Sequence, residues 1–306
     1  MMPADGIPAQ RPVLAIALMA GAGALVAVTS LIAKALGVGV GGEPLHPLQI
    51  SAGRFGFAFL AISTFALFAR PGFQGALWGS HLARSASGWL GVTCMFAAAS
   101  RMPLADATAI TFLNPLVTMG LAILLLGENI GPRRLAAAGL ALIGAMVLIR
   151  PGTDAFQPAA LIALAAAVLM GVEAVIIKRL TNAGEPPVRI LLINNGMGAI
   201  IAITAASFVW HPPSAEQWRL LACLGFAMIC AQSLFIQAMK RGQASHVMPA
   251  IYSTLVFAAL YDFGVFGVLP DLVAILGAAM VVAGIVLLAI LRERAAASNV
   301  AGSELP

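Results

Sequence analysis

Ten apolar runs, separated by short polar segments, follow one another along the chain. A transmembrane helix needs about 20 apolar residues, and these runs approach or reach that length. We predict membrane-spanning helices over residues 13–36, 47–69, 82–100, 104–126, 134–149, 157–177, 189–210, 218–239, 245–268 and 272–291. Arg11 before the first run resembles the start of a signal peptide, but the run is longer than the usual apolar region, and we expect it to be retained.

The two halves of the chain resemble each other, with matching features in the same order. The matching pairs are residues 31–34 with 175–178, residues 105–117 with 244–256, and Gly144 with Gly284. Each half has five predicted spans, an odd number, so the second copy must enter the bilayer upside down relative to the first. The pattern therefore predicts an all-α integral membrane protein with ten transmembrane helices in two inverted five-helix repeats, the architecture of many secondary transporters.

The same pattern divides the chain into four parts. They are a cytoplasmic N-terminal tail (1–12), a first repeat (13–151), a second repeat (152–292) and a cytoplasmic C-terminal tail (293–306). Both tails are assigned to the cytoplasm because Lys and Arg collect on the cytoplasmic side of membrane proteins. With the N-terminus inside, that side holds Arg11, Arg70, Arg84, Arg133, Arg134, Lys178, Arg179, Arg189, Lys240, Arg241, Arg292 and Arg294, and the other side holds only Lys34, Arg101, Arg150 and Arg219.

Composition supports a membrane location and narrows the partners. Hydrophobic residues make up 61% of the chain and charged residues 9%, against about 25% charged in soluble domains. The net charge of +5 would suggest nucleic acid only if Lys and Arg clustered on one element. They stand instead between apolar runs, so we expect the lipid bilayer, and no nucleic acid, as a partner.

One stretch of the first half carries the clearest family resemblance. It comprises residues 97–100, Pro103-Leu104-Ala105-Asp106-Ala107, Asn114-Pro115, Gly127-Glu128 and the apolar run to Gly144. These residues resemble the drug/metabolite transporter superfamily of the EamA type, whose members carry two five-helix repeats. The second-half copy departs from this pattern, with Thr254 in place of the proline and Gly267 in place of the glutamate.

The resemblance implies a secondary transporter that moves small metabolites by alternating access through a central cavity. Amino-acid exporters of the YddG kind are one candidate, which implies export of aromatic or other neutral amino acids across the cytoplasmic (inner) membrane. Metabolite uptake carriers and drug exporters share the scaffold and stay open as alternatives. The implied partner is a small-molecule substrate.

Polar side chains in the fourth and ninth spans are candidate substrate contacts, because polar groups inside a membrane are costly. Thr108, Thr111 and Asn114 fall on one helical face beside Pro115, whose missing N–H frees the Thr111 carbonyl. The alternative is that the threonines bond only their own helix. Tyr252 in the ninth span is expected to face the same cavity as the inverted-repeat partner of the fourth, or simply to pack.

Further candidates are charged or amide side chains within other spans. Arg54 suits recognition of a carboxylate by its planar fork; the alternative is a structural ion pair with Asp262 or another acid. Glu173 and Asp262 are candidates for proton coupling, with interfacial or solvated positions as their alternatives. Trp89, Asn194 and Gln232 are weighed as substrate contacts against interfacial anchoring and interhelical hydrogen bonding.

Several motifs are missing from the sequence. There is no G-x-x-x-x-G-K-[ST] phosphate loop, the four histidines lack zinc spacing, and the three cysteines stand alone in apolar stretches as packing residues. We expect no cofactor, no metal and no enzymatic activity. A membrane-embedded enzyme using Glu173 or Asp262 is the competing class, but its catalytic groups would have to converge.

Overall fold

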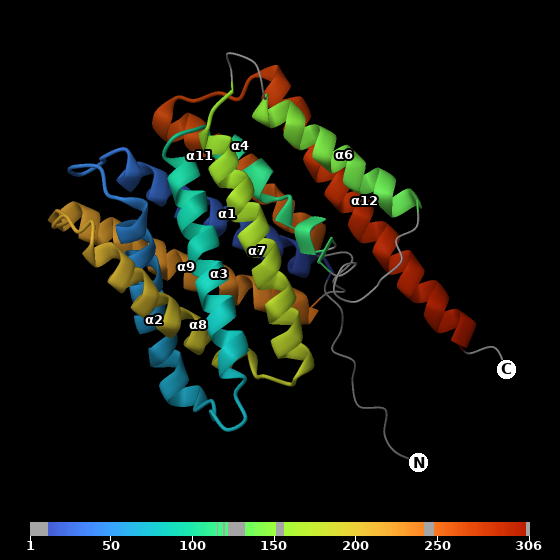
Figure 1. Ribbon diagram of the computed structural model, residues 1–306, viewed down its shortest axis with the longest axis horizontal. Coiled ribbons are helices and arrows are strands. Elements are labelled where there is room, and N and C mark those ends of the chain that lie inside the picture. The colour runs from blue at the N-terminus through green and yellow to red at the C-terminus, as the bar shows by residue number, and fades with distance from the viewer. Residues whose placement is uncertain are drawn as a thin grey trace.

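The fold was analysed in a computed structural model, which describes residues 12–114, 116–118, 120–121, 132–150, 156–241 and 248–303. These residues form α-helices and one 3₁₀-helix (Figure 1). The elements are α1 (Pro12–Gly37), α2 (Pro47–Ala69), α3 (Trp78–Ala99), α4 (Leu104–Thr111), α6 (Pro132–Ile149), α7 (Ala159–Asn182), α8 (Pro187–Ser207), α9 (Ala215–Arg241), η1 (Met248–Tyr252), α11 (Ser253–Phe266) and α12 (Leu272–Ser303).

Many of these helices are apolar enough for a bilayer. Within the described ranges, five are long enough to cross one: Val13–Gly37, Pro47–Ala69, Ala159–Ile177, Pro187–Ser207 and Ala215–Phe235. Shorter apolar helices cover Ala136–Val147, Ala250–Phe266 and Leu272–Leu287. A bundle of apolar helices in a chain with 9% charged residues confirms the predicted all-α integral membrane class.

Proline and glycine set several helix ends. Pro47 opens α2 and Pro187 opens α8, in the first turn, where the missing N–H removes no helical hydrogen bond. Gly267 ends α11 with φ 68°, a left-handed conformation that glycine adopts without strain, and its N–H donates to the Phe263 carbonyl at 2.9 Å. The glycine that departs from the family pattern thus acts as a helix cap.

Two predicted spans are not continuous α-helices. α4 stops at Thr111, followed by a turn at Phe112 and Leu113, whereas the prediction ran through to residue 126. The physical reason is local, because Pro115, outside the described residues, offers no N–H to the Thr111 carbonyl. In the second half, η1 precedes α11. The break after Thr111 is the kink that Pro115 predicts, whereas the interruption within 245–268 was not predicted, and the two fall at matching places in the two halves.

Helix pairing follows an internal two-fold relation. If α1 corresponds to α7 and α3 to α9, the packed pair α1–α9 and the packed pair α7–α3 are two copies of one contact. The α2–α8 and α6–α12 pairs each join equivalent helices of the two halves. The main hydrophobic core lies between α3, α4, α6, α7, α11 and α12 and is rich in alanine, which lets helices approach closely in lipid.

The contact between α6 and α12, here called the α6–α12 seam, shows this relation most clearly. A β-carbon at Gly144 would lie 2.7 Å from both Gly277 O and Val281 N. A β-carbon at Gly284 would lie 2.6 Å from Ala141 N and 2.7 Å from Ala137 O.

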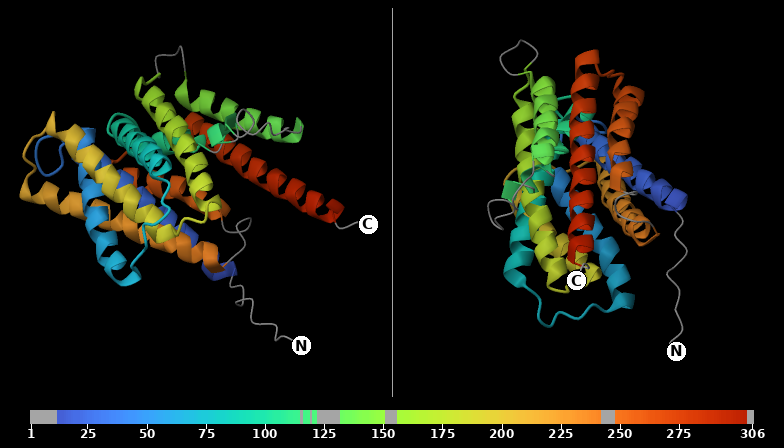
Figure 2. Two further views of the ribbon diagram at one scale, coloured as in Figure 1. Left: turned by 60° about the horizontal axis from the view of Figure 1, so that its bottom comes forward. Right: turned by 90° about the vertical axis from the view of Figure 1, so that its right-hand side faces the viewer.

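Gly144 and Gly284, Ala137 and Gly277, and Ala141 and Val281 are separated by the same number of residues. The two contacts are therefore the same contact made once by each half of the chain. Residue numbers rise along one helix as they fall along the other, so the two helices are antiparallel, as inverted repeats require. The pair lies beside the remaining helices in both Figure 1 and Figure 2.

Candidate substrate-binding site

Arg54 is held inside the bundle by the first half of α2. Its exposure is 6%, its guanidinium carbon lies 4.3 Å from the centre of the Phe55 ring, and Phe55 packs against Gly198 of α8. Its Nη1 has no hydrogen-bond partner among the described residues. A buried donor without a partner is costly, so this nitrogen marks a position where a ligand oxygen would be stabilised.

Arg84 and Glu173 form an ion pair beside it. Arg84 Nη2 lies 3.5 Å from Glu173 Oε1, and Arg84 Nη1 donates to the Ile190 carbonyl at 3.2 Å. Arg54 is within electrostatic reach of both groups. Glu173 therefore lies against α3 within the bundle, and its predicted role in proton coupling stays a prediction.

Gly88 makes room for this carboxylate. A β-carbon at Gly88 would lie 2.8 Å from Glu173 Oε1, and one at Gly91 would lie 3.1 Å from Met170. Arg84, Gly88 and Gly91 share one face of α3 by their spacing, and this face packs against α7. Because the glycines bring the two helices together, the Glu173 side chain meets Arg84 instead of ending in lipid.

Asn194 joins the same region from α8. Ile190, Asn194 and Gly198 lie four residues apart on one helical face; Ile190 contacts Arg84, and Gly198 contacts Phe55. Asn194 thus lies between these two contacts, with 5% exposure and an Oδ1 that has no partner in the described part of the chain. We call Arg54, Arg84, Glu173 and Asn194 the polar cluster.

Trp89 borders the polar cluster. Its indole Nε1 donates to Ser51 Oγ at 3.2 Å, and the ring packs against the buried group that includes Ala52 and Phe55. Trp89 therefore links α3 to α2 one turn from Arg54. Its predicted contact with substrate stays a prediction.

The polar face predicted for the fourth span, with Thr108 and Thr111, is mainly buried by helix packing. Thr108 and Thr111 hydroxyls donate to the carbonyls of Leu104 and Ala107, both at 2.7 Å, which is the local bonding weighed as the alternative. Their role as substrate contacts, like that of Asn114, stays a prediction.

The two interrupted spans meet, as the inverted repeat predicts. The rings of Phe112 and Tyr252 contact edge to face at 5.3 Å. Behind this contact, a β-carbon at Gly171 would lie 2.9 Å from the Asn114 carbonyl. Gly171 is two residues before Glu173, so this region adjoins the polar cluster along α7.

The alternative that pairs Arg54 with Asp262 is excluded, because Asp262 has another partner. Asp262 forms a buried ion pair with Lys34 of α1, and its other oxygen accepts a hydrogen bond from the Leu104 backbone N–H at 2.8 Å. Lys34 lies in the last turn of α1 and Leu104 begins α4, so Asp262 ties α11 to both helices. Whether Asp262 couples protons stays a prediction.

Gln232 lies on α9, which packs against α1 and α2. It is half-buried, and its Oε1 has no partner in the part of the chain that the structure describes. Its predicted contact with substrate therefore also stays a prediction. A search of the described residues finds no group of three or more His, Cys, Asp or Glu side chains that could hold a metal ion.

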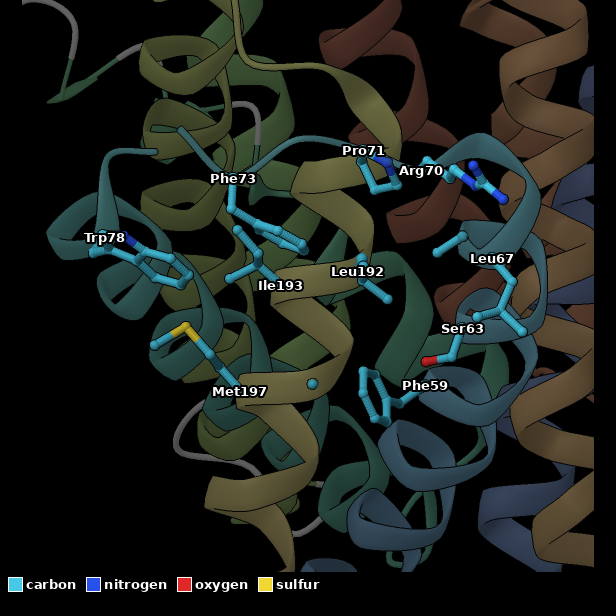
Figure 3. A pocket seen from close by; sticks show the side chains of 12 residues that line it. Phe59, Ser63, Leu67, Arg70, Pro71, Phe73, Trp78, Leu192, Ile193 and Met197 are labelled. Atoms are coloured by element: carbon cyan, nitrogen blue, oxygen red, sulfur yellow. The ribbon is translucent and has the colours of Figure 1, made fainter. Parts of the chain in front are cut away.

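A cleft on the described part of the chain lies apart from the polar cluster. A cavity of about 470 Å³ opens between α2 and α8, with Phe59 and Ser63 facing Leu192 and Met197 across it (Figure 3). Its lining is almost entirely apolar, whereas recognition of a polar metabolite needs placed polar groups. We therefore base the site on the buried polar groups rather than on cleft size.

A smaller hollow of about 220 Å³ lies between Asp106, Arg150 and Asp271. Arg150 Nη2 donates to both oxygens of Asp271, at 2.5 and 2.7 Å. This hydrogen bonding lowers the pKa of Asp271 below its ordinary value. The pair closes one end of the α6–α12 seam, because Arg150 directly follows α6 and Asp271 directly precedes α12.

Arg84 is the residue that reasoning from sequence missed. It had been counted among the interfacial arginines, but it is 5% exposed and lies in the second turn of α3. The spacing of Arg84 to Gly88 and Gly91 carried the signal, since a charge on a small-residue face points toward a neighbouring helix.

Buried polar groups between paired helices of two inverted halves define a membrane carrier. The EamA-like transporter family matches the chain twice, over residues 13–150 and 157–290. The chain therefore belongs to the EamA-like transporter family.

Relatives share moderate sequence identity over most of the chain. A S-adenosylmethionine uptake transporter of Rickettsia bellii is 25% identical over 79% of this chain and 83% of its own length. A riboflavin transporter of Rhizobium johnstonii is 29% identical over 66% of this chain and 67% of its own. A pseudopaline exporter of Pseudomonas aeruginosa is 26% identical over 66% of this chain and 71% of its own length.

One solved crystal structure has a similar fold. It superposes with a TM-score of 0.61 at 21% identity, covering 92% of this chain and 98% of the other. The relatives carry small molecules inward or outward, and their names describe transporters. The chain is thus a transporter of the drug/metabolite type, built from two repeats.

Proposed function

We propose that this chain is a secondary carrier for small metabolites that bear a carboxylate, and that it exports neutral amino acids by alternating access. The observation that carries the proposal is the unpartnered, buried Nη1 of Arg54. A guanidinium presents two parallel donors that match a carboxylate. Nearby, the free Oδ1 of Asn194 is an acceptor, suited to an ammonium group.

The names of the relatives support the substrate class in part. S-adenosylmethionine, named for the Rickettsia bellii relative, contains an α-amino acid group, with one carboxylate and one ammonium. Riboflavin, named for another relative, has neither group. Substrates therefore differ across the family, and the polar cluster of this chain favours the amino-acid class.

The test uses proteoliposomes and two probes. Exchange of labelled phenylalanine is measured for the wild type and for Arg54→Gln, with riboflavin exchange as the probe that lacks a carboxylate. We expect phenylalanine exchange to fall about 10- to 100-fold in the variant, since a charge-assisted hydrogen bond contributes about 1.5–3 kcal/mol. Riboflavin exchange, if present, should be unchanged.

Arg219→Gln is the matched control. Arg219 is exposed, and its Nε donates to the carbonyl of Ala215 in its own helix at 3.2 Å, so this change should leave exchange intact. Equal losses in both variants, or no exchange of any amino acid in the wild type, would contradict the proposal. Exchange driven only by an inward gradient would point to the uptake alternative, and exchange of riboflavin alone to the drug or vitamin class.

A further inference from the structure

Two guanidinium groups share one carboxylate in the polar cluster. Glu173 lies 3.5 Å from Arg84 and within electrostatic reach of Arg54. Both arginines are more than nine-tenths buried, and each retains a side-chain nitrogen without a partner among the described residues, Nη1 in Arg54 and Nε in Arg84. The protein thus supplies one carboxylate, that of Glu173, for two guanidinium groups that could each bind a carboxylate.

We propose that Glu173 is a specificity-determining residue that limits the substrate to a single carboxylate. This inference rests on the proposed function. Glu173 occupies the guanidinium of Arg84 as a built-in counterion, so that only Arg54 is left for the substrate. A second carboxylate on the substrate would meet a guanidinium whose charge Glu173 already balances, and it would lie near the negative charge of Glu173.

The surroundings of Glu173 hold it in this role. Gly88 leaves the carboxylate space against the α3 backbone, with a β-carbon excluded at 2.8 Å. Arg84 is fixed in turn by the Ile190 carbonyl at 3.2 Å. An unpaired charge inside a membrane is costly, so without Glu173 the Arg84 guanidinium would need another anion, and a second substrate carboxylate would supply it.

The experiment compares two amino acids of nearly equal shape. Exchange of labelled glutamine and glutamate is measured in proteoliposomes, with phenylalanine as the reference substrate. In Glu173→Gln we expect the ratio of glutamate to glutamine exchange to rise at least tenfold. Glu173→Asp keeps the counterion and should retain the wild-type ratio.

A double variant separates selectivity from stability. Arg84→Gln with Glu173→Gln removes both members of the ion pair and leaves Arg54 alone, so the wild-type ratio should return. Arg84→Gln by itself frees Glu173 to pair with Arg54 and should lower exchange of both amino acids. If Glu173→Gln fails to fold, the double variant is compared with Arg84→Gln. Higher glutamine exchange in the double variant would still support the counterion role of Glu173, and equal exchange would contradict it.

The outcomes distinguish the two proposals. A folded Glu173→Gln that still exchanges phenylalanine but gains no glutamate exchange overturns the counterion role and leaves the proposed function standing. A Glu173 with only a structural role would lower the yield of folded protein without changing the ratio. If the wild type exchanges no amino acid at all, the proposed function fails, and the counterion role fails with it.

Discussion

The α6–α12 seam and the polar cluster make different use of the two repeats. In the seam, the close approach at Gly144 is repeated at Gly284 with equivalent neighbours. In the polar cluster, the carboxylate is not repeated. Aligning Lys34 with Lys178 sets Glu173 opposite Thr29, whose hydroxyl donates to the Val26 carbonyl of its own helix at 2.7 Å.

The difference separates scaffold from chemistry. Where two equivalent helices pack about a two-fold relation, the same close backbone contact forms twice. A small residue is therefore needed at the equivalent position of each helix. A charged group that meets a substrate is needed once, and a second buried charge would be costly. Substitutions in the seam should therefore act in equal pairs, and substitutions of charges should act singly.

The largest effect is expected in the seam. Gly144→Leu and Gly284→Leu each drive a side chain into backbone atoms less than 3.0 Å away. Overpacking costs typically about 1–3 kcal/mol where neighbouring side chains can move, and backbone atoms move less. We expect both variants to lose most of the folded protein, to a similar extent, by size-exclusion chromatography in detergent.

Gly139→Leu is the control for this pair. Gly139 also lies on α6, but nothing lies within 4 Å of a β-carbon placed there. Its yield should match the wild type. A severe loss at Gly144 with a mild loss at Gly284 would break the symmetry that the seam is said to have.

The next largest effect concerns the ion pair of Lys34 and Asp262. It joins one repeat to the other, and its side chains are 8% and 2% exposed. Removing one partner of a buried ion pair costs about 3–5 kcal/mol, whereas replacing both by apolar residues is often close to neutral. Lys34→Met or Asp262→Leu should lower the Tm more than the double variant does.

This comparison tests whether the pair is held by charge. If the double variant is as unstable as the sum of the single ones, the loss comes from packing and from the hydrogen bond to the Leu104 N–H, not from an unpaired charge. Thermal denaturation followed by tryptophan fluorescence measures all four proteins in the same detergent.

The smallest effect is expected at Asp271. Its pair with Arg150 is partly exposed, and exposed pairs contribute little. Because the hydrogen bond from Arg150 lowers the pKa of Asp271, the stabilisation is present above the ordinary value of about 3.9 and is lost as the pH falls below it. Asp271→Asn should lower the Tm slightly at pH 7.

The pH dependence is the check on this pair. The difference between the wild type and Asp271→Asn should shrink as the pH is lowered from about 5 toward 3. A difference that stays constant over that range would mean that Asp271 acts through its hydrogen bond to the Ala274 N–H rather than through charge.

Periodicity and repetition sufficed to predict the helical class and the correspondence of Gly144 with Gly284. An apolar run indicates burial and not continuity, so the 3₁₀-helix before α11 was not predicted, whereas Pro115 predicted the break after Thr111. Periodicity and repetition also misassigned Arg84 and left the partner of Asp262 open. The partner of a buried charge depends on how helices cross, and no local pattern contains that crossing. The orientation of the termini and the division at 151 and 152 stay predictions.

The seam has a consequence for the origin of the fold. Its two glycines make the same contact with exchanged roles, so a half-length chain with a single glycine could form both contacts by pairing with an antiparallel copy of itself. An ancestral gene of half the present length would then have encoded a self-complementary helix, and duplication would have left each copy free to change its charges.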